Sequence, residues 1–231
     1  MKRRILVVDI GGSNVKLMIS SRAKRRRFPS GPNLTPRQAV RQIKQVAADW
    51  NFDSVSIGFP APVRAGKIMK DPKNLGKGWA GFDFAKALRK PVRVINDAAL
   101  QALGSYRGGG RMLFLGLGTG LGSALVWKGH VLSLELGDLP YNDEWIIEDW
   151  LGEDGLETLG KKDWRSETVR AVKQLKLALI ADYVVLGGGN AKLIEKLPAG
   201  VELGSNRNAY PGGCRLWQTN PKTKRPRWRI M

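Results

Sequence analysis

Short apolar runs recur along this 231-residue chain, and glycine, proline or charged residues separate them. Residues 5–8 and 15–19 are two such runs, each typical of a buried strand. The tight-turn sequence Gly11, Gly12, Ser13 and Asn14 joins them, so the pattern predicts a β-hairpin with Asp9 at its mouth. Two interpretations stay open. The turn is either an ordinary hairpin turn or a cradle for phosphate, beside which Asp9 would hold a hydrated metal ion.

A second glycine hairpin follows the pattern of the first. Residues 112–126 have the pattern of a strand, a glycine turn and a second strand. When the two segments are aligned at an offset of 107 residues, Met112 corresponds to Ile5 and Gly118 to Gly11. A repeat at nearly half the chain length predicts two similar lobes, each offering a glycine hairpin to a shared cleft.

The rest of the chain alternates between strand and helix patterns. Strands are expected over residues 54–60 and 91–95, and helices over 35–50, 82–90, 97–106, 146–152 and 166–181. Residues 182–197 predict a strand, a glycine turn and a helix. This alternation predicts an α/β architecture with largely buried sheets.

Charge is the most unusual feature of the composition. The chain has 39 Lys and Arg against 20 Asp and Glu, a net charge of +19, and a sequence pI near 10.4. Such a surface favours polyanionic partners, although solubility alone is a simpler explanation. Arg25 to Arg27, Arg107 and Arg111 are candidates for a basic track near the cleft. The apolar content of 42% excludes a disordered chain.

Cellular location follows from three weaker signals. The single cysteine, Cys214, excludes an internal disulfide and a multi-cysteine zinc site. No apolar stretch approaches the roughly 20 residues of a membrane-spanning helix. The basic start is followed by an apolar run that Asp9 interrupts, which disfavours a signal peptide. We therefore expect a soluble, cytoplasmic protein, with His130 on its surface.

The residues from 219 to 231 are rich in proline and basic side chains and have no periodicity. They predict a mobile tail, either simply solvated or bound to a polyanion.

Two further features could carry chemistry. A dinucleotide-binding interpretation of residues 116–122 fails because a strand-like segment, not a helix, follows. The turn at residues 187–190 does precede an expected helix, whose N-terminus could meet a phosphate. Asn96 and Asp97 stand between a strand and a helix. Asp97 is either a helix cap or a general base that accepts a proton from a sugar hydroxyl.

Six segments together resemble a known family. "DIGGSNVKL", "NLGKGWAGFDFAKAL", "INDAALQALGSY", "LFLGLGTGLGSAL", "LELGDLPY" and "YVVLGGGNAKLI" occur in the order found in sugar kinases of the ROK family, and most resemble its polyphosphate glucokinase branch. The resemblance spans roughly residues 4–217 and implies a two-lobed actin/hexokinase-like (ribonuclease H-like) fold with a central cleft. It implies an N-terminal lobe over 1–107, a C-terminal lobe over 108–218 and a basic tail over 219–231.

The resemblance also implies an activity, namely phosphoryl transfer from polyphosphate or ATP to glucose or a related hexose, with Mg²⁺ as cofactor. Asp97 would be the catalytic base, and Asp9 would anchor the metal through water. The sugar would be bound by Asn74, Asn96, Glu135 and Asp138. The donor would be bound by Asp9, Gly11, Gly12, Ser13, Asn14, Lys16, Gly118, Thr119, Gly120, Gly188, Gly189 and Asn190. A homodimer is possible, and no membrane partner or zinc ion is expected.

The chain departs from the family pattern in three respects. Asp138 stands where members usually have histidine, the zinc-binding cysteines are absent, and the chain is shorter than typical members. The alternative is therefore a non-catalytic protein of the same fold that senses sugar or binds a polyanion; nucleic acid is possible but not favoured. A repressor with an added DNA-binding domain is disfavoured because the first strand begins within five residues of Met1.

Overall fold

The computed structural model describes residues 3–20 and 25–231. The first of its two large sheets has the strand order β3-β2-β1-β4-β7. Strand β1 pairs antiparallel with β2 and parallel with β4. The strands are β1 (Ile5–Ile10), β2 (Asn14–Ile19), β3 (Arg25–Pro29), β4 (Ser54–Phe59) and β7 (Val92–Asn96).

The second sheet repeats this arrangement, with the order β12-β11-β8-β9-β10-β13. Strand β8 pairs antiparallel with β9 and parallel with β11, as β1 does with β2 and β4. The strands are β8 (Met112–Leu117), β9 (Leu121–Trp127), β10 (His130–Leu134), β11 (Tyr183–Gly187), β12 (Val201–Leu203) and β13 (Arg229–Ile230). The predicted repeat is confirmed, because β1 and β8 begin 107 residues apart and occupy equivalent places.

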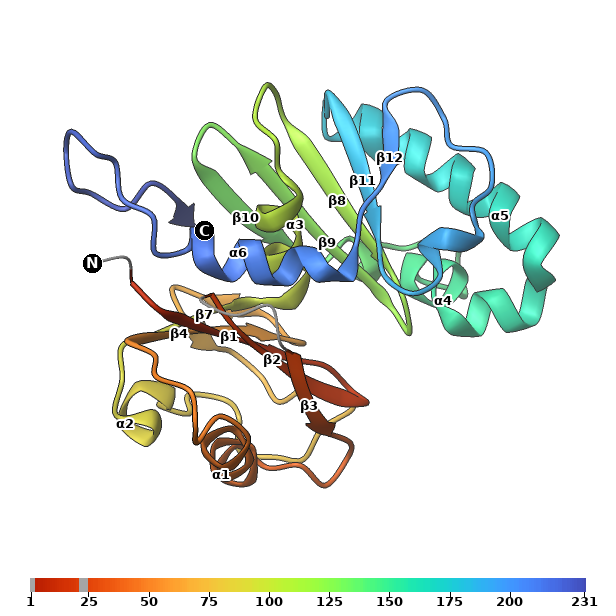
Figure 1. The fold of residues 1–231 in the computed structure, drawn as a ribbon. Helices are drawn as coiled ribbons and strands as arrows, with labels where there is room; N and C mark the ends of the chain where they lie inside the picture. The colour runs from red at the N-terminus through yellow and green to blue at the C-terminus, as the bar shows by residue number, and fades with distance from the viewer. Residues whose placement is uncertain (1–2, 21–24) are drawn as a thin grey trace.

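Helices α1 (Pro36–Val46) and α2 (Phe84–Leu88) cover the outer face of the first sheet (Figure 1). Thr35 and Gln38 form a capping box at the start of α1, and Ala39, Val40 and Ile43 bury its apolar face. The predicted helix over 35–50 ends early, because the chain turns after Ala47. A small hairpin, β5 (Val63–Arg64) and β6 (Lys67–Ile68), lies in the same lobe.

Helices α3 (Asp97–Ser105) and α6 (Ala209–Arg215) lie between the two sheets (Figure 1). They approach closely because of glycine: a Cβ on Gly104 would lie 1.7 Å from the Asn208 carbonyl oxygen. The Ser56 hydroxyl of β4 donates to the Gly213 carbonyl oxygen at 2.7 Å. The second half of the chain therefore packs on the first sheet, and the division at residues 107 and 108 stays a prediction.

Helices α4 (Ile147–Leu151) and α5 (Glu153–Ala178) cover the outer face of the second sheet. The predicted helix over 166–181 therefore begins earlier in the structure, and Gly160, with a φ of 71°, breaks α5. No helix in the described ranges combines the length and apolar character needed to cross a membrane.

The helix predicted after the third glycine turn is wrong. Only one turn of 3-10 helix, η2 (Ala191–Leu193), follows Asn190. Ile194 then adopts an extended conformation and buries its side chain in the core. Pro198 and Gly200 lead directly into β12, so a phosphate here would meet loop N–H groups rather than a helix dipole.

The prediction of a mobile tail is also wrong. Strand β13 pairs in parallel with β10 through Arg229 and His130, and Thr219 bridges to Pro226. Trp228 is buried and meets Tyr106 edge-on, with ring centroids 5.8 Å apart. One buried tryptophan and a strand edge thus fix a segment whose composition alone is typical of disorder.

Candidate active site

The carboxyl ends of three neighbouring strands meet at the cleft between the lobes. In the register of the first sheet, Asp9 of β1 lies opposite Gly58 of β4, and Gly58 lies opposite Ile95 of β7. Asp97 follows two residues after Ile95. Side chains alternate along β1, so Ile5, Val7 and Asp9 share the face that looks toward the second lobe.

Gly58 was not among the predicted site residues. A Cβ at this position would lie 2.7 Å from the Leu100 Cδ2 atom, whereas it would make ordinary contacts of 3.4 Å with the Asp97 Cα atom and 3.6 Å with Asp9 Oδ1. The glycine therefore lets helix α3 pack closely on β4, which brings Asp97 near Asp9. A glycine inside an otherwise apolar strand is the sequence signal that could have identified it.

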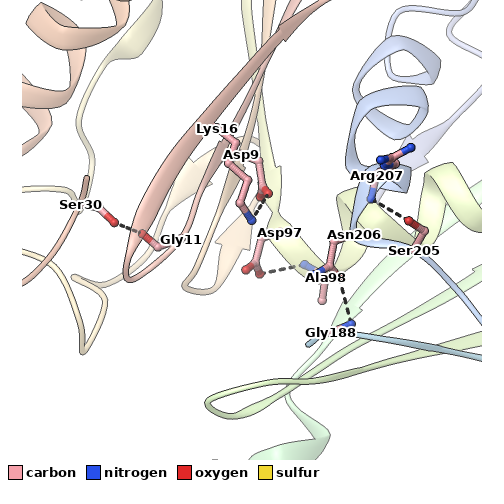
Figure 2. A network of polar contacts seen from close by, with 10 residues as sticks. All are labelled: Asp9, Gly11, Lys16, Ser30, Asp97, Ala98, Gly188, Ser205, Asn206 and Arg207. Carbon is pink, nitrogen blue, oxygen red and sulfur yellow. Dashed lines mark hydrogen bonds and ion pairs between the residues drawn. The ribbon is translucent and has the colours of Figure 1, made fainter. Parts of the chain in front are cut away.

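Asp9 is buried, with 8% of its surface exposed, and its Oδ2 atom lies 3.7 Å from Lys16 Nζ. Burial raises the pKa of Asp9, and the Lys16 ammonium opposes that shift. Figure 2 shows the Asp9, Lys16 and Asp97 side chains directed into the same space. Two acidic groups and one cation from separate elements thus lie close together.

The interpretation of Asp97 as the helix cap is wrong, because Asn96 caps α3. Asn96 Oδ1 accepts a hydrogen bond from the Ala99 N–H at 3.1 Å. Asp97 is the first helical residue, and its Oδ1 accepts from the Ala98 N–H at 2.8 Å. Burial, and then the nearby Asp9 carboxylate, raise the pKa of Asp97 to about 7. Asp97 is therefore poised to exchange a proton near neutral pH.

The first glycine turn is held by backbone contacts. The Gly11 N–H donates to the Asn14 carbonyl oxygen at 3.0 Å, and the Ser30 hydroxyl donates to the Gly11 carbonyl oxygen at 2.6 Å (Figure 2). Neither Gly11 nor Gly12 has a positive φ. Glycine is needed here for closeness, because a Cβ on Gly12 would lie 3.3 Å from the Asn74 Cβ. This contact places Asn74, a predicted sugar ligand, against the turn. Ser13 is exposed on the same turn.

The second and third glycine turns lie against each other. Asn190 donates from its backbone N–H to the Leu117 carbonyl oxygen at 3.0 Å, and from Nδ2 to the Gly118 carbonyl oxygen at 3.4 Å. Gly188 has a φ of +84°, and a Cβ there would lie 2.0 Å from the Leu117 carbonyl oxygen. The structure therefore brings the predicted segments 118–120 and 188–190 together. The Thr119 hydroxyl donates to Glu153 Oε2 at 3.4 Å.

Glu135 and Asp138 are the other predicted sugar ligands. Glu135 directly precedes the 3-10 turn η1 (Leu136–Asp138), Asp138 is its last residue, and both are exposed. Partial burial and the Asp138 carboxylate raise the pKa of Glu135, and Lys70 opposes the shift. These groups are close enough to Asp97 for Glu135 to contribute to the raised pKa of that residue.

Glu148 of α4 was also missed by the sequence analysis. One of its oxygens, Oε2, accepts from the Leu121 N–H at 3.3 Å, and the other, Oε1, pairs with Lys73 Nζ of the first lobe at 3.2 Å. A Cβ on Gly137 would lie 3.1 Å from the Glu148 Cβ. Glu148 thus contacts three parts of the molecule: the second glycine turn, the 3-10 turn that follows Glu135, and Lys73 in the opposite lobe. No local sequence pattern signals a contact spanning 75 residues.

A basic cavity of about 490 Å³ opens beside the third glycine turn. Gly188, Gly189 and Tyr210 line it, together with four cationic side chains: Lys16, Arg25, Lys192 and Arg207. The Arg25 guanidinium lies 5.1 Å from the centre of the Tyr210 ring. The Gly188 N–H donates to Asn206 Oδ1 at 3.2 Å (Figure 2). The cavity therefore has the charge expected of an anion-binding site.

Most of the predicted basic track lies elsewhere. Arg25 lines the cavity, but Arg26 pairs with Asp49, Arg107 pairs with Glu202, and Arg111 lies over the Trp127 ring. Arg27 is exposed on β3. The prediction of a basic track near the cleft is wrong for Arg26, Arg107 and Arg111, because contacts outside the cleft hold each of these side chains. His130 is exposed, as predicted.

The residues present are suited to Mg²⁺ bound largely through water. Within residues 3–20 and 25–231, no group of three or more His, Cys, Asp and Glu side chains gathers to hold a metal alone. Asp9 and Asp97 supply two neighbouring carboxylates, and Mg²⁺ usually takes one or two carboxylates plus waters and substrate phosphates.

Two duplicated sheets around a cleft define the actin/hexokinase-like fold. The computed structure aligns with the crystal structure of an inorganic polyphosphate/ATP-glucomannokinase from Arthrobacter sp. strain KM at a TM-score of 0.79 and 23% identity. That alignment covers 92% of this chain and 97% of the other. A ROK family glucokinase from Streptomyces griseus, in complex with glucose and AMPPNP, aligns at a TM-score of 0.67 and 16% identity, over 90% of this chain and 97% of the other.

The sequence matches the ROK family model over residues 5–137, and the chain belongs to the ROK family. It is 23% identical over 221 residues to the polyphosphate glucokinase of Mycobacterium tuberculosis (strain ATCC 25618 / H37Rv), covering 82% of this chain and 78% of that protein. It is 30% identical over 134 residues to the glucokinase of Pyrobaculum calidifontis. That match covers 56% of this chain and only 41% of the glucokinase.

Proposed function

We propose that this protein is a sugar kinase that transfers a phosphoryl group from polyphosphate or ATP to glucose or a related hexose. The observation that carries the proposal is the placement of Asp97 beside Asp9, where its pKa is raised to about 7. Membership of the ROK family and the activities named for its relatives support the same reaction.

In the proposed mechanism Asp97 is the general base. Its carboxylate accepts the proton of the sugar hydroxyl as the hydroxyl oxygen attacks the terminal phosphorus of the donor. The bond from that phosphorus to the bridging oxygen breaks, and the shortened donor leaves with the electron pair. Asn74, Asn96, Glu135 and Asp138 would hold the remaining hydroxyls, because a polyol needs amide and carboxylate partners in place of water.

The donor would lie along the glycine turns and the basic cavity. Lys16, Lys192 and Arg207 line the basic cavity and offer positive charge to a phosphate chain. The N–H groups of Gly11 and Gly118 are hydrogen-bonded within their own turns, so other backbone N–H groups of residues 11–14 and 118–120 would contact the donor. Asp9 would hold Mg²⁺ through water, and the ion would supply charge neutralisation at the transferring group. Glu148 would keep the second turn in place through Leu121.

The first experiment measures glucose phosphorylation with Mg²⁺, using polyphosphate and ATP separately as the only donor. Turnover with either donor supports the proposal, and the faster donor identifies what the basic cavity is adapted to bind. Sugar binding without turnover would favour a sensing role.

The second experiment replaces Asp97 with asparagine, which keeps the shape and removes the base. We expect Asp97→Asn to lower kcat by about 10²–10⁴-fold while glucose affinity, measured by calorimetry, stays nearly unchanged. A variant that keeps its rate would show that Asp97 is not the base.

A further inference from the structure

A second concentration of positive charge lies outside the cleft, in residues 217–231, which we call the basic strap. This segment contains Lys222, Lys224, Arg225, Arg227 and Arg229, and no Asp or Glu. All five side chains are exposed. Every ion pair found among residues 3–20 and 25–231 involves other cations. The strap therefore presents cations that the described part of the protein does not neutralise.

The strap holds these cations on an ordered frame. The Asn220 N–H donates to the Arg225 carbonyl oxygen at 2.8 Å, and the Arg227 N–H donates to the Gln218 carbonyl oxygen at 2.9 Å. Trp228 Nε1 donates to Gln218 Oε1 at 3.3 Å. An ordered row of charges loses less conformational entropy on binding an anion than a disordered tail does. The backbone contacts thus favour binding.

The basic surface continues onto the neighbouring β9–β10 turn. The Arg229 N–H donates to the Gly129 carbonyl oxygen at 2.8 Å, which places Lys128 beside the strap. Lys128 and Arg111 both lie over the Trp127 ring, each 4.6 Å from its centre. In Figure 1 the strap stands beside β10, at the edge of the second sheet.

The aromatic rings of this region distinguish between two kinds of polyanion. Single-stranded nucleic acid binds by stacking bases on free aromatic faces as well as by charge. Here cations already lie over the rings: Arg111 and Lys128 over Trp127, and Arg3 and Arg93 over Trp217. Arg227 lies 5.8 Å from the centre of the Trp228 ring. The surface therefore favours a phosphate chain without bases.

We propose that the basic strap, together with Lys128 and Arg111, binds inorganic polyphosphate at a second site outside the catalytic cleft. The inference rests on the proposed function, because the same polymer would be the phosphoryl donor. Asp97 begins α3, and Tyr106, just beyond the end of α3, touches Trp228. Nine helical residues span about 13 Å, so tripolyphosphate is too short to reach both the cleft and the strap, whereas a longer chain reaches both. The strap would raise the local concentration of long chains.

The test compares two triple variants with the same change of charge. Lys222→Gln, Lys224→Gln and Arg225→Gln alter the strap, whereas the control changes Lys161, Lys162 and Lys173 to Gln on α5, where all three are exposed. Equilibrium binding of long-chain polyphosphate and of tripolyphosphate is measured without sugar at several salt concentrations. Steady-state rates are measured with each donor and with ATP.

We expect the strap variant to raise the Kd and KM for long-chain polyphosphate about tenfold. The slope of log K against log salt should fall by about 0.7 per lost contact, as for single-stranded nucleic acids. The kcat of the strap variant, and its KM for tripolyphosphate and for ATP, should stay unchanged. The control variant should match the native protein in all these measurements.

Three results would overturn the second site. These are equal affinity of both variants for long chains, an equal loss for tripolyphosphate, and binding of single-stranded RNA of matched charge as tight as that of polyphosphate. Failure of the proposed kinase activity is a separate result, because the binding measurements need no turnover. Strap-dependent binding of long chains without phosphorylation would support the site and reject the kinase.

Discussion

The two glycine hairpins share one backbone plan but differ in chemistry. In the first, Asp9 lies opposite Lys16 on the cleft-facing side of the sheet. In the second hairpin Gly116 stands at the position equivalent to Asp9, and its partner across the strands is Gly122. The next residue, Ser123, uses its hydroxyl in bonds to the Leu134 carbonyl oxygen and the Leu136 N–H. The same frame thus occurs twice, and at these paired positions only the first hairpin carries charged side chains.

The second hairpin is specialised for close packing instead. A Cβ on Gly122 would lie 2.9 Å from the Ala98 Cβ, and a Cβ on Gly120 would lie 2.3 Å from Glu148 Oε2. The first hairpin has milder contacts: a Cβ on Gly11 would lie 3.3 Å from the Asn14 carbonyl oxygen, and a Cβ on Gly12 would lie 3.3 Å from the Asn74 Cβ. Substitutions should therefore impair catalysis in the first hairpin, whereas in the second hairpin and the adjoining third turn they should destabilise the fold.

The largest effect is expected from Gly188→Ala. The new methyl group would meet the Leu117 carbonyl oxygen, and the positive φ of Gly188 disfavours alanine. We expect the free energy of unfolding to fall by about 3 kcal/mol, measured by urea denaturation. Gly189→Ala is the matched control, because nothing lies within 4 Å of a Cβ there. Equal losses for both variants would contradict the packing role.

Asp9→Asn should act on the rate instead. Removing the charge takes away the proposed outer contact to Mg²⁺, so we expect kcat to fall about 100-fold while the protein stays folded. Steady-state kinetics at saturating Mg²⁺ check the fall in kcat, and far-ultraviolet circular dichroism checks that the variant stays folded. The double variant Asp9→Gly with Gly116→Asp, which moves the carboxylate to the other hairpin, should not recover the rate. Recovery would mean that the hairpins are interchangeable.

The raised pKa of Asp97 predicts a pH-dependent stability. The folded state has a pKa of about 7 against a usual value of 3.8, so the folded protein favours the neutral acid. That stabilisation is complete below pH 3.8 and is lost as the pH rises through 7. Asp97→Asn should therefore gain stability over the native protein between pH 5 and 8, reaching about 2 kcal/mol, as measured by denaturation at each pH. A difference in stability between the two proteins that does not vary with pH would indicate that Asp97 has an ordinary pKa.

The smallest effect is expected from Lys73→Ala, which removes the ion pair with Glu148 across the lobes. The Lys73 side chain is 77% exposed, so the pair should contribute less than about 1 kcal/mol to stability. Its loss should change the KM for glucose more than it changes kcat. An effect on kcat comparable to that of Asp9→Asn would mean that the second lobe contributes more to catalysis than this comparison implies.

Local patterns predicted the frame of the molecule well. Alternating strand and helix periods gave the α/β class, and the matched glycine turns gave the two sheets with the offset of 107 residues between β1 and β8. Thr35 and Pro36 correctly marked the start of α1. These signals succeed because each depends on a few neighbouring residues whose backbone preferences agree with the final fold.

Two of the errors concern contacts that are distant in sequence, and a third concerns two adjacent residues. Glu148 reaches Leu121 and Lys73 from a helix whose local sequence gives no reason to expect either contact. The strap is ordered by pairing with β10, about 100 residues earlier in the chain, which composition does not reveal. Asp97 was assigned a possible capping role because both it and Asn96 suit the position, and only the backbone geometry selects Asn96.

The packing of α6 on the first sheet has a consequence for how the protein folds during synthesis. The Ser56 hydroxyl is bonded to the Gly213 carbonyl oxygen, 157 residues away, and Gly213 lies against Val7. The part of the inner face of the first sheet around Val7 and Ser56 therefore stays uncovered until the ribosome has released the segment around Gly213. During that interval an apolar sheet face is open to aggregation and to chaperones, and maturation should be limited by this late docking step.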